Sequence, residues 1–420
     1  MVRFKPAPSA SFERRRKARR AMRLSDLGHN GVPHRGGLGS ALVLLAIALT
    51  AGDTYAHGPA VEKTVLFVAG RDGYFTYRIP AICVTPQGAI LAAAAGRYDS
   101  ASDWANADLM IRRSPDGGEA WEDQQVLVDD GSNTVDNPTF IVDWQSGAVH
   151  LMYQIRYARA YIKTSRNEGV AWSPPREITY AFEQFRSRDG YDWQVLAMGP
   201  GHGIMLRSGR MVAPVWLSTE QRHRPSISAT IYSDDGGESW QAGEVIARTT
   251  EETRNPSEHQ LVELADGRVL ANIRTESPLH RRLIAVSPDG AGGWTKPRFA
   301  DDLYEPICMA SMIALEAEGA SGRPRFLAFA NPDSGPSQPG GKQGSRDRRN
   351  LTLKLSADEG ATWKAALTLD AGASGYSDMA RASNGDVLVL YEAERKSPQG
   401  PFVPRTITLA RIKAATLATE

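Results

Sequence analysis

The sequence has few cysteines and lacks a hydrophobic segment long enough to cross a membrane. Its 420 residues include only Cys83 and Cys308, and two cysteines do not make a disulfide framework. Both lie in apolar, strand-like runs, so we expect buried free thiols. The eight histidines show no metal-ligand spacing, so we expect neither a metal site nor a cofactor. The apolar run Ala41–Leu49 is shorter than the roughly 20 residues that a membrane-spanning helix needs.

Positive charge is concentrated at the start of the chain. Residues 1–56 hold ten of the 49 lysines and arginines but three of the 48 acidic residues, so this segment carries +7 and the remainder about −6. A mildly acidic body gives no support for nucleic-acid binding. The basic segment leads into the apolar run and then into Thr54-Tyr55-Ala56, an order typical of a signal peptide.

We therefore expect residues 1–56 to be a signal peptide with a long basic n-region and a mature chain that starts near His57. The product would be secreted or periplasmic, with no stable membrane insertion once the signal is removed. Two alternatives stay open: translation that starts at Met22, and a short membrane anchor in place of a cleaved signal.

Two families of short turns recur along the rest of the chain. The first is a glycine turn followed by an alternating apolar run, a strong hairpin signal. Its six copies recur at intervals of 55 to 63 residues: Gln87-Gly88, Ser146-Gly147, Ser208-Gly209, Asp266-Gly267, Ser321-Gly322 and Asn384-Gly385. A period this even indicates a repeat architecture.

The second family, the Asp/Trp turn, follows the pattern Ser-x-Asp-x-Gly-x-(Thr/Ser/Ala)-Trp. Its five copies contain five of the nine tryptophans: Ser114–Trp121, Ser165–Trp172, Ser233–Trp240, Ser287–Trp294 and Ser356–Trp363. Two copies are degenerate, with Asn167 for the Asp and Ala291 for the Gly. We expect the Asp to cap backbone N–H groups, the Gly to adopt a positive φ and the Trp to pack beneath. These turns are predicted to be structural.

The alternation of the two turns predicts four strands in each repeat of roughly 60 residues. Six such repeats indicate an all-β fold, a six-bladed β-propeller with four-stranded antiparallel blades that occupies residues 57–420. The alternating tail Thr406–Ile412 reads as a strand that closes the ring against the first blade.

Charged and aromatic side chains collect at one end of the expected strands. Residues that begin the first or third strand of a blade, or end the second, lie on the face opposite both turn families. Eight residues share this face: Arg78, Arg97, Asp103, Asn137, Glu258, Arg274, Arg348 and Tyr376. Each has a structural explanation on its own, such as a surface pair of Arg97 with Asp99. Together they predict a site, because the planar arginine fork is suited to binding a carboxylate.

In these motifs the chain resembles the bacterial exo-sialidase (neuraminidase) family, over residues 65–415. The resemblance is carried by Tyr77-Arg78-Ile79-Pro80, Arg97 followed by Asp103, the Asp/Trp turns, Glu258 with Arg274, Arg348-Arg-Asn-Leu351 and Gly375-Tyr376-Ser377. It implies an exo-α-sialidase that removes terminal sialic acids from glycans with retention of configuration. It implies sialylated glycoproteins, glycolipids or oligosaccharides as partners.

The resemblance also implies a role for each site residue. Arg78, Arg274 and Arg348 would bind the substrate carboxylate, with Arg346 or Arg349 as substitutes for Arg348. Asp103 would be the general acid/base, Tyr376 the nucleophile and Glu258 the base that activates it. Arg97 and Asn137 would line the pocket, and His202 has no expected role beyond pocket lining.

Two other functions remain open at this stage. A hydrolase or transglycosidase acting on a related nonulosonic acid would use the same arginines and the same Tyr/Glu pair. A non-catalytic propeller that binds sialoglycans would be expected to lack Asp103, Glu258 or Tyr376, and all three are present.

Overall fold

The computed structural model describes residues 61–316, 324–396 and 402–417. The chain divides into two compact units, Met1–Gly58 and Pro59–Glu420, and all described residues belong to the second. The predicted signal peptide and the predicted turn Ser321-Gly322 therefore lie outside the described residues. Within the described part, no helix is long and apolar enough to cross a membrane.

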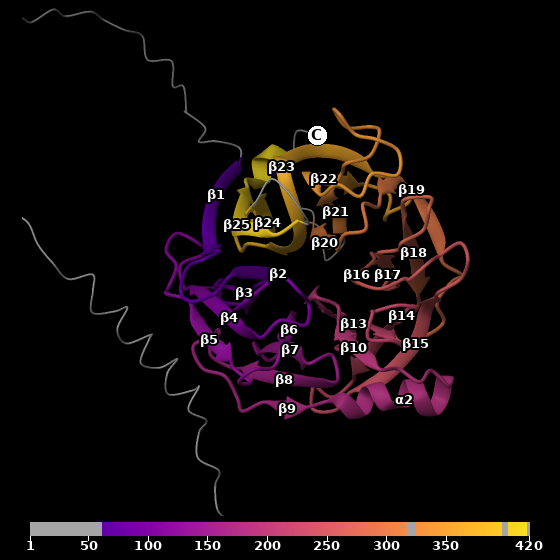
Figure 1. The fold of residues 1–420 in the computed structure, drawn as a ribbon, viewed down its shortest axis with the longest axis horizontal. Coiled ribbons are helices and arrows are strands. Elements are labelled where there is room, and N and C mark those ends of the chain that lie inside the picture. Colours follow the sequence, from indigo (N-terminus) through magenta and orange to yellow (C-terminus); the bar gives the residue numbers. More distant parts are fainter. Residues whose placement is uncertain (1–60, 317–323, 397–401, 418–420) are drawn as a thin grey trace, which may run out of the picture. The chain divides into compact units, whose positions relative to one another are not determined.

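The second unit is built from mainly antiparallel β-sheets that lie side by side in a ring (Figure 1). The first sheet has the order β2-β3-β4-β5 and contains β2 (Thr76–Val84), β3 (Ile90–Arg97), β4 (Ala107–Ser114) and β5 (Gln125–Val128). The second has the order β11-β6-β7-β8-β9 and contains β6 (Val135–Val142), β7 (Val149–Ile155), β8 (Arg159–Ser165), β9 (Arg176–Glu177) and β11 (Gly201–His202).

Two further sheets follow along the chain. The third has the order β10-β13-β14-β15, with β12 also on β13, and contains β10 (Val195–Met198), β12 (Ile204–Met205), β13 (Met211–Ser218), β14 (Ser226–Ser233) and β15 (Gln241–Arg248). The fourth has the order β16-β17-β18-β19 and contains β16 (His259–Glu263), β17 (Val269–Ile273), β18 (Arg281–Ser287) and β19 (Arg298–Tyr304).

The last strands form one continuous sheet with the order β1-β25-β24-β23-β22-β21-β20. Its members are β1 (Val61–Val68), β20 (Ser311–Glu316), β21 (Pro324–Pro332), β22 (Arg349–Ser356), β23 (Lys364–Arg381), β24 (Val387–Arg395) and β25 (Pro404–Ile412). The long strand β23 pairs with β22 through its first part and with β24 through its second. The sheet is therefore two four-stranded groups that share one strand. The predicted propeller class is confirmed, and the count of six blades remains a prediction that this pairing favours.

Ring closure differs from the prediction. The C-terminal strand β25 was expected to pair with the first blade, but it lies inside the last sheet, between β24 and β1. The outer strand of that sheet is the N-terminal strand β1, so the two ends of the described chain close the ring by pairing with each other. This pairing covers the free edge of β25, and β1 becomes the outer edge strand of the sheet.

The hydrophobic core lies between neighbouring sheets. One cluster joins Ala81 and Cys83 of β2 to Phe140 of β6 and Leu151 of β7. Both cysteines are buried free thiols, as predicted. All eight residues of β3 are buried, because this strand is covered on both faces. Each fully buried leucine or phenylalanine contributes about 1.5–3 kcal/mol to the folded state.

The two turn families have the predicted local structure. The glycines of the five described hairpin turns all have positive φ: Gly88, Gly147, Gly209, Gly267 and Gly385. In the Asp/Trp turn at Ser233, Asp235 accepts the N–H of Ser239 at 2.8 Å, and Ser233 accepts that of Gly237 at 2.9 Å. The indole of Trp240 is buried beneath the turn. The predicted capping role of the aspartate is confirmed.

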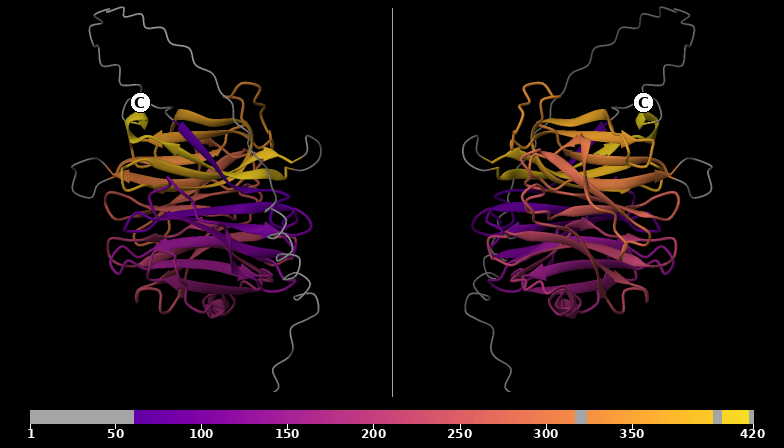
Figure 2. Two further views of the ribbon diagram at one scale, coloured as in Figure 1. Left: turned by 90° about the vertical axis from the view of Figure 1, so that its left-hand side faces the viewer. Right: turned by 90° about the vertical axis from the view of Figure 1, so that its right-hand side faces the viewer.

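The sequence did not predict the helix α2 (Thr179–Asp189), which lies at the edge of the sheets (Figure 2). Phe182 and Phe185 are buried against the core of the third sheet, and Gly190 ends the helix in the left-handed conformation. Arg188 fixes the helix to β15 by donating to the carbonyl oxygen of Ala242 at 3.0 Å. A second helix, α3 (Ala414–Leu417), follows β25.

Candidate active site

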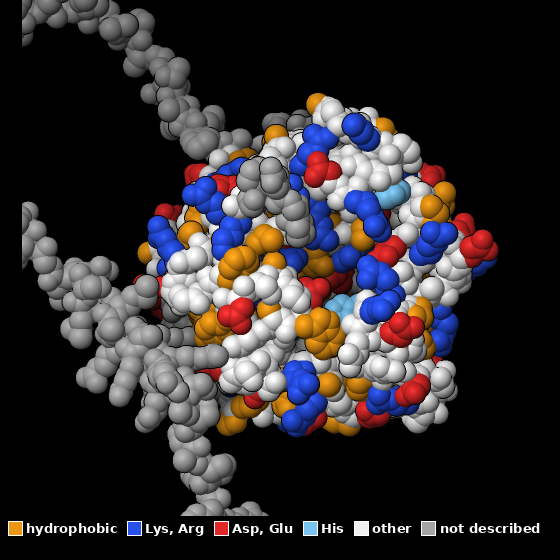
Figure 3. All heavy atoms as spheres, in the orientation of Figure 1, with side chains coloured by type: hydrophobic (Ala, Val, Ile, Leu, Met, Phe, Trp, Pro, Cys, Tyr) orange, Lys and Arg blue, Asp and Glu red, His pale blue; other side chains and the backbone are white. Residues whose placement is uncertain are grey.

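A polar pocket of about 170 Å³ opens at the ends of the inner strands that lie away from the turns. Thr76, at the start of β2, is paired with Arg97, at the end of β3, so these two strand ends meet at one edge of the first sheet. The other sheets bring corresponding ends to the same place. The face in Figure 3 has a hollow near its middle where basic and acidic side chains gather.

The lining of this pocket is dominated by charged and aromatic side chains. It consists of Arg78, Ile79, Asp103, Asn137, Tyr157, Trp216, His223, Arg224, Ser226, Asn255, Ser257, Glu258, Arg274, Glu276, Arg348 and Tyr376. Four arginines and three carboxylates are among these residues. The Arg224 guanidinium is already paired with Glu276, to which its Nε donates at 2.9 Å.

Three of the arginines surround the ring of Tyr376. The guanidinium carbons of Arg78, Arg274 and Arg348 lie 5.3, 6.0 and 5.3 Å from the centroid of that ring. Arg78 is fixed by its Nε, which donates to Glu392 Oε1 at 2.6 Å, and Arg348 by its Nη2, which donates to the Ile307 carbonyl at 2.9 Å. Within the described part of the chain, each of these guanidiniums keeps at least one nitrogen without a hydrogen-bond partner. Three clustered cations with spare donors make a site for an anion.

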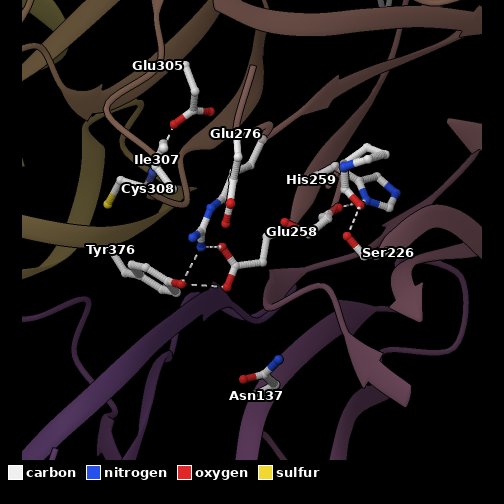
Figure 4. Close-up of polar contacts among 12 residues, drawn as sticks. Asn137, Ser226, Glu258, His259, Glu276, Glu305, Ile307, Cys308 and Tyr376 are labelled. Atoms are coloured by element: carbon white, nitrogen blue, oxygen red, sulfur yellow. Dashed lines mark hydrogen bonds and ion pairs between the residues drawn. The ribbon is translucent and has the colours of Figure 1, made fainter. Parts of the chain in front are cut away.

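The Tyr376 hydroxyl and the Glu258 carboxylate face each other and are joined by a hydrogen bond (Figure 4), and Arg274 contacts both groups. Tyr376 Oη donates to Glu258 Oε1 at 2.5 Å and accepts from Arg274 Nη1 at 2.7 Å. Arg274 also pairs with the other carboxylate oxygen of Glu258. Burial raises the pKa of Tyr376 above its usual value, and the opposing effect of Arg274 does not offset this. The phenol is therefore neutral in the free protein, with a carboxylate placed to take its proton.

Asp103 lies at the rim of the same pocket. Its Oδ1 is 3.0 Å from Arg97 Nη1, and its side chain is 47% exposed. Burial would raise the pKa of Asp103, but the positive charges of Arg97 and Arg78 outweigh it and lower the pKa to about 2. Asp103 is therefore ionised at neutral pH.

Irregularities in the inner strands aim these side chains at the pocket. The pairing of β2 with β3 shifts between Arg78 and Ala81, and that of β6 with β7 between Asp136 and Thr139. In both places a residue with positive φ, Ile79 or Asn137, precedes a proline. Bulges of this kind redirect side chains and are frequent beside active sites. A further shift in β23, between Ser374 and Ser377, contains Tyr376.

Seven of the eight predicted site residues line the pocket: Arg78, Asp103, Asn137, Glu258, Arg274, Arg348 and Tyr376. The exception is Arg97, whose predicted place in the lining needs correction. Its side chain is fully buried behind Asp103 and pairs with the equally buried Asp136 at 2.7 Å. The buried acid at position 136 holds it there, and the surface pair with Asp99 is not formed.

The substitutes for Arg348 lie elsewhere. Arg349 pairs with Asp347 at 3.0 Å, and neither Arg346 nor Arg349 lines the pocket. Asn137 keeps its predicted place and donates its Nδ2 to the Met198 carbonyl at 3.0 Å.

His202 does not belong to this pocket. It lines a second cavity of about 570 Å³ at the opposite ends of the inner strands, together with residues such as Val84 and Ser383. Its Nδ1 lies 2.6 Å from Asp378 Oδ1. The histidine is the second residue of β11 and pairs with Phe140 of β6 near that end, so the glycine turn around it cannot reach the pocket.

Sequence reasoning missed the residues that support the pocket. Glu392 is completely buried, and besides Arg78 it accepts the backbone N–H groups of Ile79 and Tyr376, each at 3.1 Å. No local pattern marks it, because its partners are distant in sequence. An aromatic group was also missed: Trp104, Tyr157, Trp216 and His223. The one available signal was the tryptophan directly after Asp103. No cluster of three or more metal-ligating side chains occurs among the described residues.

Comparison with known proteins gives a consistent family. The model of the BNR repeat-like domain matches residues 88–389. A sialidase of Micromonospora viridifaciens is 31% identical over 80% of this chain, and one of Bacteroides fragilis is 29% identical over 77%. The matches span 52% and 61% of those two proteins, so the chain corresponds to about half of the longer relative.

A solved structure also resembles this one. Hadza microbial sialidase Hz136 superposes with a TM-score of 0.66 at 26% identity, over 83% of this chain and 67% of that one. Since the family model covers well over half of the residues, the chain belongs to the BNR repeat-like domain family and, within it, to the sialidases.

Proposed function

We propose that this protein is an exo-α-sialidase that hydrolyses terminal sialic acids from glycoconjugates with retention of configuration. The observation that carries the proposal is the cluster of three guanidiniums around a tyrosine whose hydroxyl donates to a glutamate at 2.5 Å. A sugar acid with a carboxylate on its anomeric carbon fits this cluster, because the arginines hold the carboxylate while the phenol faces the adjacent carbon.

A tyrosine nucleophile suits such a substrate. A carboxylate nucleophile would approach the substrate carboxylate against charge repulsion, whereas the neutral phenol of Tyr376 does not. Most glycosidases use two carboxyl groups, and sialidases with a tyrosine nucleophile are an exception to this scheme. In the first step Tyr376 Oη bonds to the anomeric carbon and its proton passes to Glu258, while the bond to the leaving oxygen breaks. The intermediate is a covalent glycosyl-tyrosine.

Asp103 supplies the proton for the leaving oxygen. In the second step it takes a proton from water, which attacks the anomeric carbon and releases the tyrosine oxygen, and Glu258 returns the phenolic proton. Because the pKa of Asp103 is held at about 2 by neighbouring arginines, protonation has to become easier when substrate binds. The substrate carboxylate provides this, since it offsets the positive charge of the cluster.

Two predicted substrate contacts receive different roles. We assign Arg97 to positioning, because its buried guanidinium holds Asp103 at the rim of the pocket. Asn137 stays a proposed substrate contact, since it lines the pocket and its Nδ2 is fixed by the Met198 carbonyl. Export to the periplasm or the exterior also stays a proposal and rests on residues 1–56.

A fluorogenic glycoside of N-acetylneuraminic acid tests the activity. The wild-type protein should hydrolyse it, and Tyr376→Phe and Asp103→Ala should each reduce kcat/KM by about 10²-fold or more. Tyr232→Phe is the matched control, because that hydroxyl contacts Gln241 away from the pocket. Full activity in both site variants would refute the mechanism. Binding without turnover would favour a sialoglycan-binding propeller, and turnover of only a related nonulosonic acid would favour the other enzyme.

A further inference from the structure

The proposed acid/base lies at the tip of a short loop that is anchored on both sides of the tip, because Arg97 donates to the Ala101 carbonyl and Thr134 to the Ala105 carbonyl. Residues 98–106 connect β3 to β4, and the Tyr98 N–H donates to the Asn106 carbonyl at 3.0 Å to close the loop. At the tip, the Ala105 N–H donates to the Ser102 carbonyl at 3.0 Å. Asp103 and Trp104 are therefore the two central residues of a tight turn. Anything that holds Trp104 also restricts Asp103.

Trp104 is 44% exposed, which is unusual for so large an apolar side chain, yet its ring has two aromatic partners. Its centroid lies 5.0 Å from that of Tyr157 and 5.5 Å from that of His223. The Tyr157 and His223 rings lie 4.7 Å apart, and His223 meets the buried Trp216 edge-on at 5.2 Å. Such pairs contribute about 0.5–1.5 kcal/mol each beyond the area that they bury.

The partners of Trp104 come from other sheets and are held in unusual backbone conformations. Tyr157 lies between β7 and β8 of the second sheet, and His223 between β13 and β14 of the third. Their φ angles are +54° and +63°. Bulky residues rarely adopt positive φ, and the cost persists only where the surroundings require the conformation. Both side chains also line the pocket, so the group lies directly beside the reacting atoms.

We propose that Trp104 is a positioning residue, which packs on Tyr157 and His223 and thereby fixes the Asp103 carboxyl at the place of the leaving oxygen. This inference rests on the proposed sialidase activity. Arg97 fixes one oxygen of Asp103 from behind, and the aromatic group fixes the backbone of the turn from the side. Without the indole, the central residues of the turn would move more freely between the anchored carbonyls of Ala101 and Ala105, and Asp103 would spend less time in line with the leaving group.

A leaving-group comparison distinguishes positioning of the acid from a general structural role. The leaving group of sialyllactose is a sugar alcohol, whose oxygen must be protonated as the bond breaks. A nitrophenyl sialoside has a good leaving group, nitrophenolate, which departs without protonation. Misplacement of a catalytic group by about 1 Å can reduce the rate about 10²-fold. Trp104→Ala should therefore lower kcat/KM for sialyllactose about 10- to 100-fold. For the nitrophenyl sialoside the loss should stay below about threefold, since acid assistance matters little there. Trp104→Phe should restore most of the lost activity.

Two controls complete the kinetic test. Trp144→Ala removes a similarly exposed indole, 59% accessible, on the rim of the other cavity, and should leave both substrates unaffected. In an Asp103→Ala background, Trp104→Ala should cause no further loss on sialyllactose, measured by chromatography of released sugar. A further loss there would mean that the indole contacts the leaving sugar directly, and would overturn the proposal. Equal losses on both substrates in the wild-type background would also overturn it.

Hydrogen exchange provides a readout that does not depend on turnover. Trp104→Ala should speed amide exchange at residues 98–106 at least about tenfold, while Trp144→Ala should not. If the wild-type protein fails to hydrolyse either sialoside, the proposed function is wrong, yet the exchange measurement still tests whether Trp104 restrains the turn. Unchanged exchange at residues 98–106 would refute the restraint itself.

Discussion

Replacing Glu392 by glutamine removes one carboxylate oxygen from the contact that joins β2 to β23. Glu392 Oε1 accepts from Arg78 Nε at 2.6 Å and from the Ile79 N–H at 3.1 Å, while Oε2 accepts from the Tyr376 N–H at 3.1 Å. An amide has one acceptor and one donor. Whichever way it is placed, at least one buried donor faces another donor, and the charge of Arg78 loses its buried partner.

The expected magnitude follows from burial. Both side chains of the pair are at most 8% exposed, and breaking such a pair from one side costs about 3–5 kcal/mol. With an unfolding entropy of about 2.1 cal/mol/K per residue over Pro59–Glu420, this corresponds to a fall in Tm of about 4 to 7 °C. Arg78 would also lose its orientation toward the proposed substrate carboxylate. One charge-assisted hydrogen bond of about 1.5–3 kcal/mol corresponds to a fall in kcat/KM of about 10- to 150-fold.

Thermal unfolding followed by circular dichroism, together with kinetics at 25 °C, measures both effects. Glu394→Gln is the matched control, two residues further along β24. That carboxylate is 57% exposed and lies 3.5 Å from the exposed Arg405, so its loss should cost about 0–1 kcal/mol. If Glu392→Gln matched this control in Tm and in kcat/KM, Glu392 would not be what holds Arg78 and Tyr376 in place.

Three further predictions concern charged groups, two of them in the pocket and the third in the cavity at the opposite ends of the inner strands. Arg78→Lys keeps the charge but loses both the planar fork and the bond from Nε to Glu392, so kcat/KM should fall about tenfold or more, and unchanged kinetics would remove Arg78 from the carboxylate site. Binding of a sialic acid analogue at pH 5 should be accompanied by proton uptake, because the bound carboxylate raises the depressed pKa of Asp103. Calorimetry in two buffers of different ionisation enthalpy should show less proton uptake for Asp103→Asn than for the wild-type protein. Equal uptake in both would contradict this reasoning. Burial lowers the pKa of His202, but the carboxylate of Asp378 outweighs burial and raises it. The ion pair therefore stabilises the folded protein fully below the unfolded-state pKa of about 6.5, and this contribution declines as pH rises through the raised folded-state pKa. The loss of unfolding free energy caused by His202→Gln should follow the same pH dependence. Urea unfolding at pH 5.5 and pH 9 would measure this difference, and a constant difference would exclude the ion pair as its source.

The shared face of the site was predictable because its markers are local. A glycine turn at Gly88 and an Asp/Trp turn at Ser114 each fix the chain direction within a few residues, so the sequence determines which strand ends meet. This placed Arg78, Glu258 and Tyr376 together although 118 residues separate the last two. The depth of each side chain was not predictable in this way. Arg97 was assigned to the correct strand end, but it was expected in the pocket lining and is buried behind it. The buried partner Asp136, which determines this position, is not indicated by any local pattern.

The contacts that tune the site depend on pairs without a local signal. Glu392 is 314 residues from Arg78, and its carboxylate joins two inner strands that only ring closure makes adjacent. Closure of the ring depends on the pairing of β1 with β25. The sequence pattern of each strand predicts a strand but does not determine which other strand it pairs with. The sequence by itself determined the propeller class and the face on which the candidate site residues meet, because turns and strand alternation are short-range properties. Only the tertiary structure decided which of those side chains are buried, which are paired and which remain available to a ligand, since these depend on contacts between distant blades.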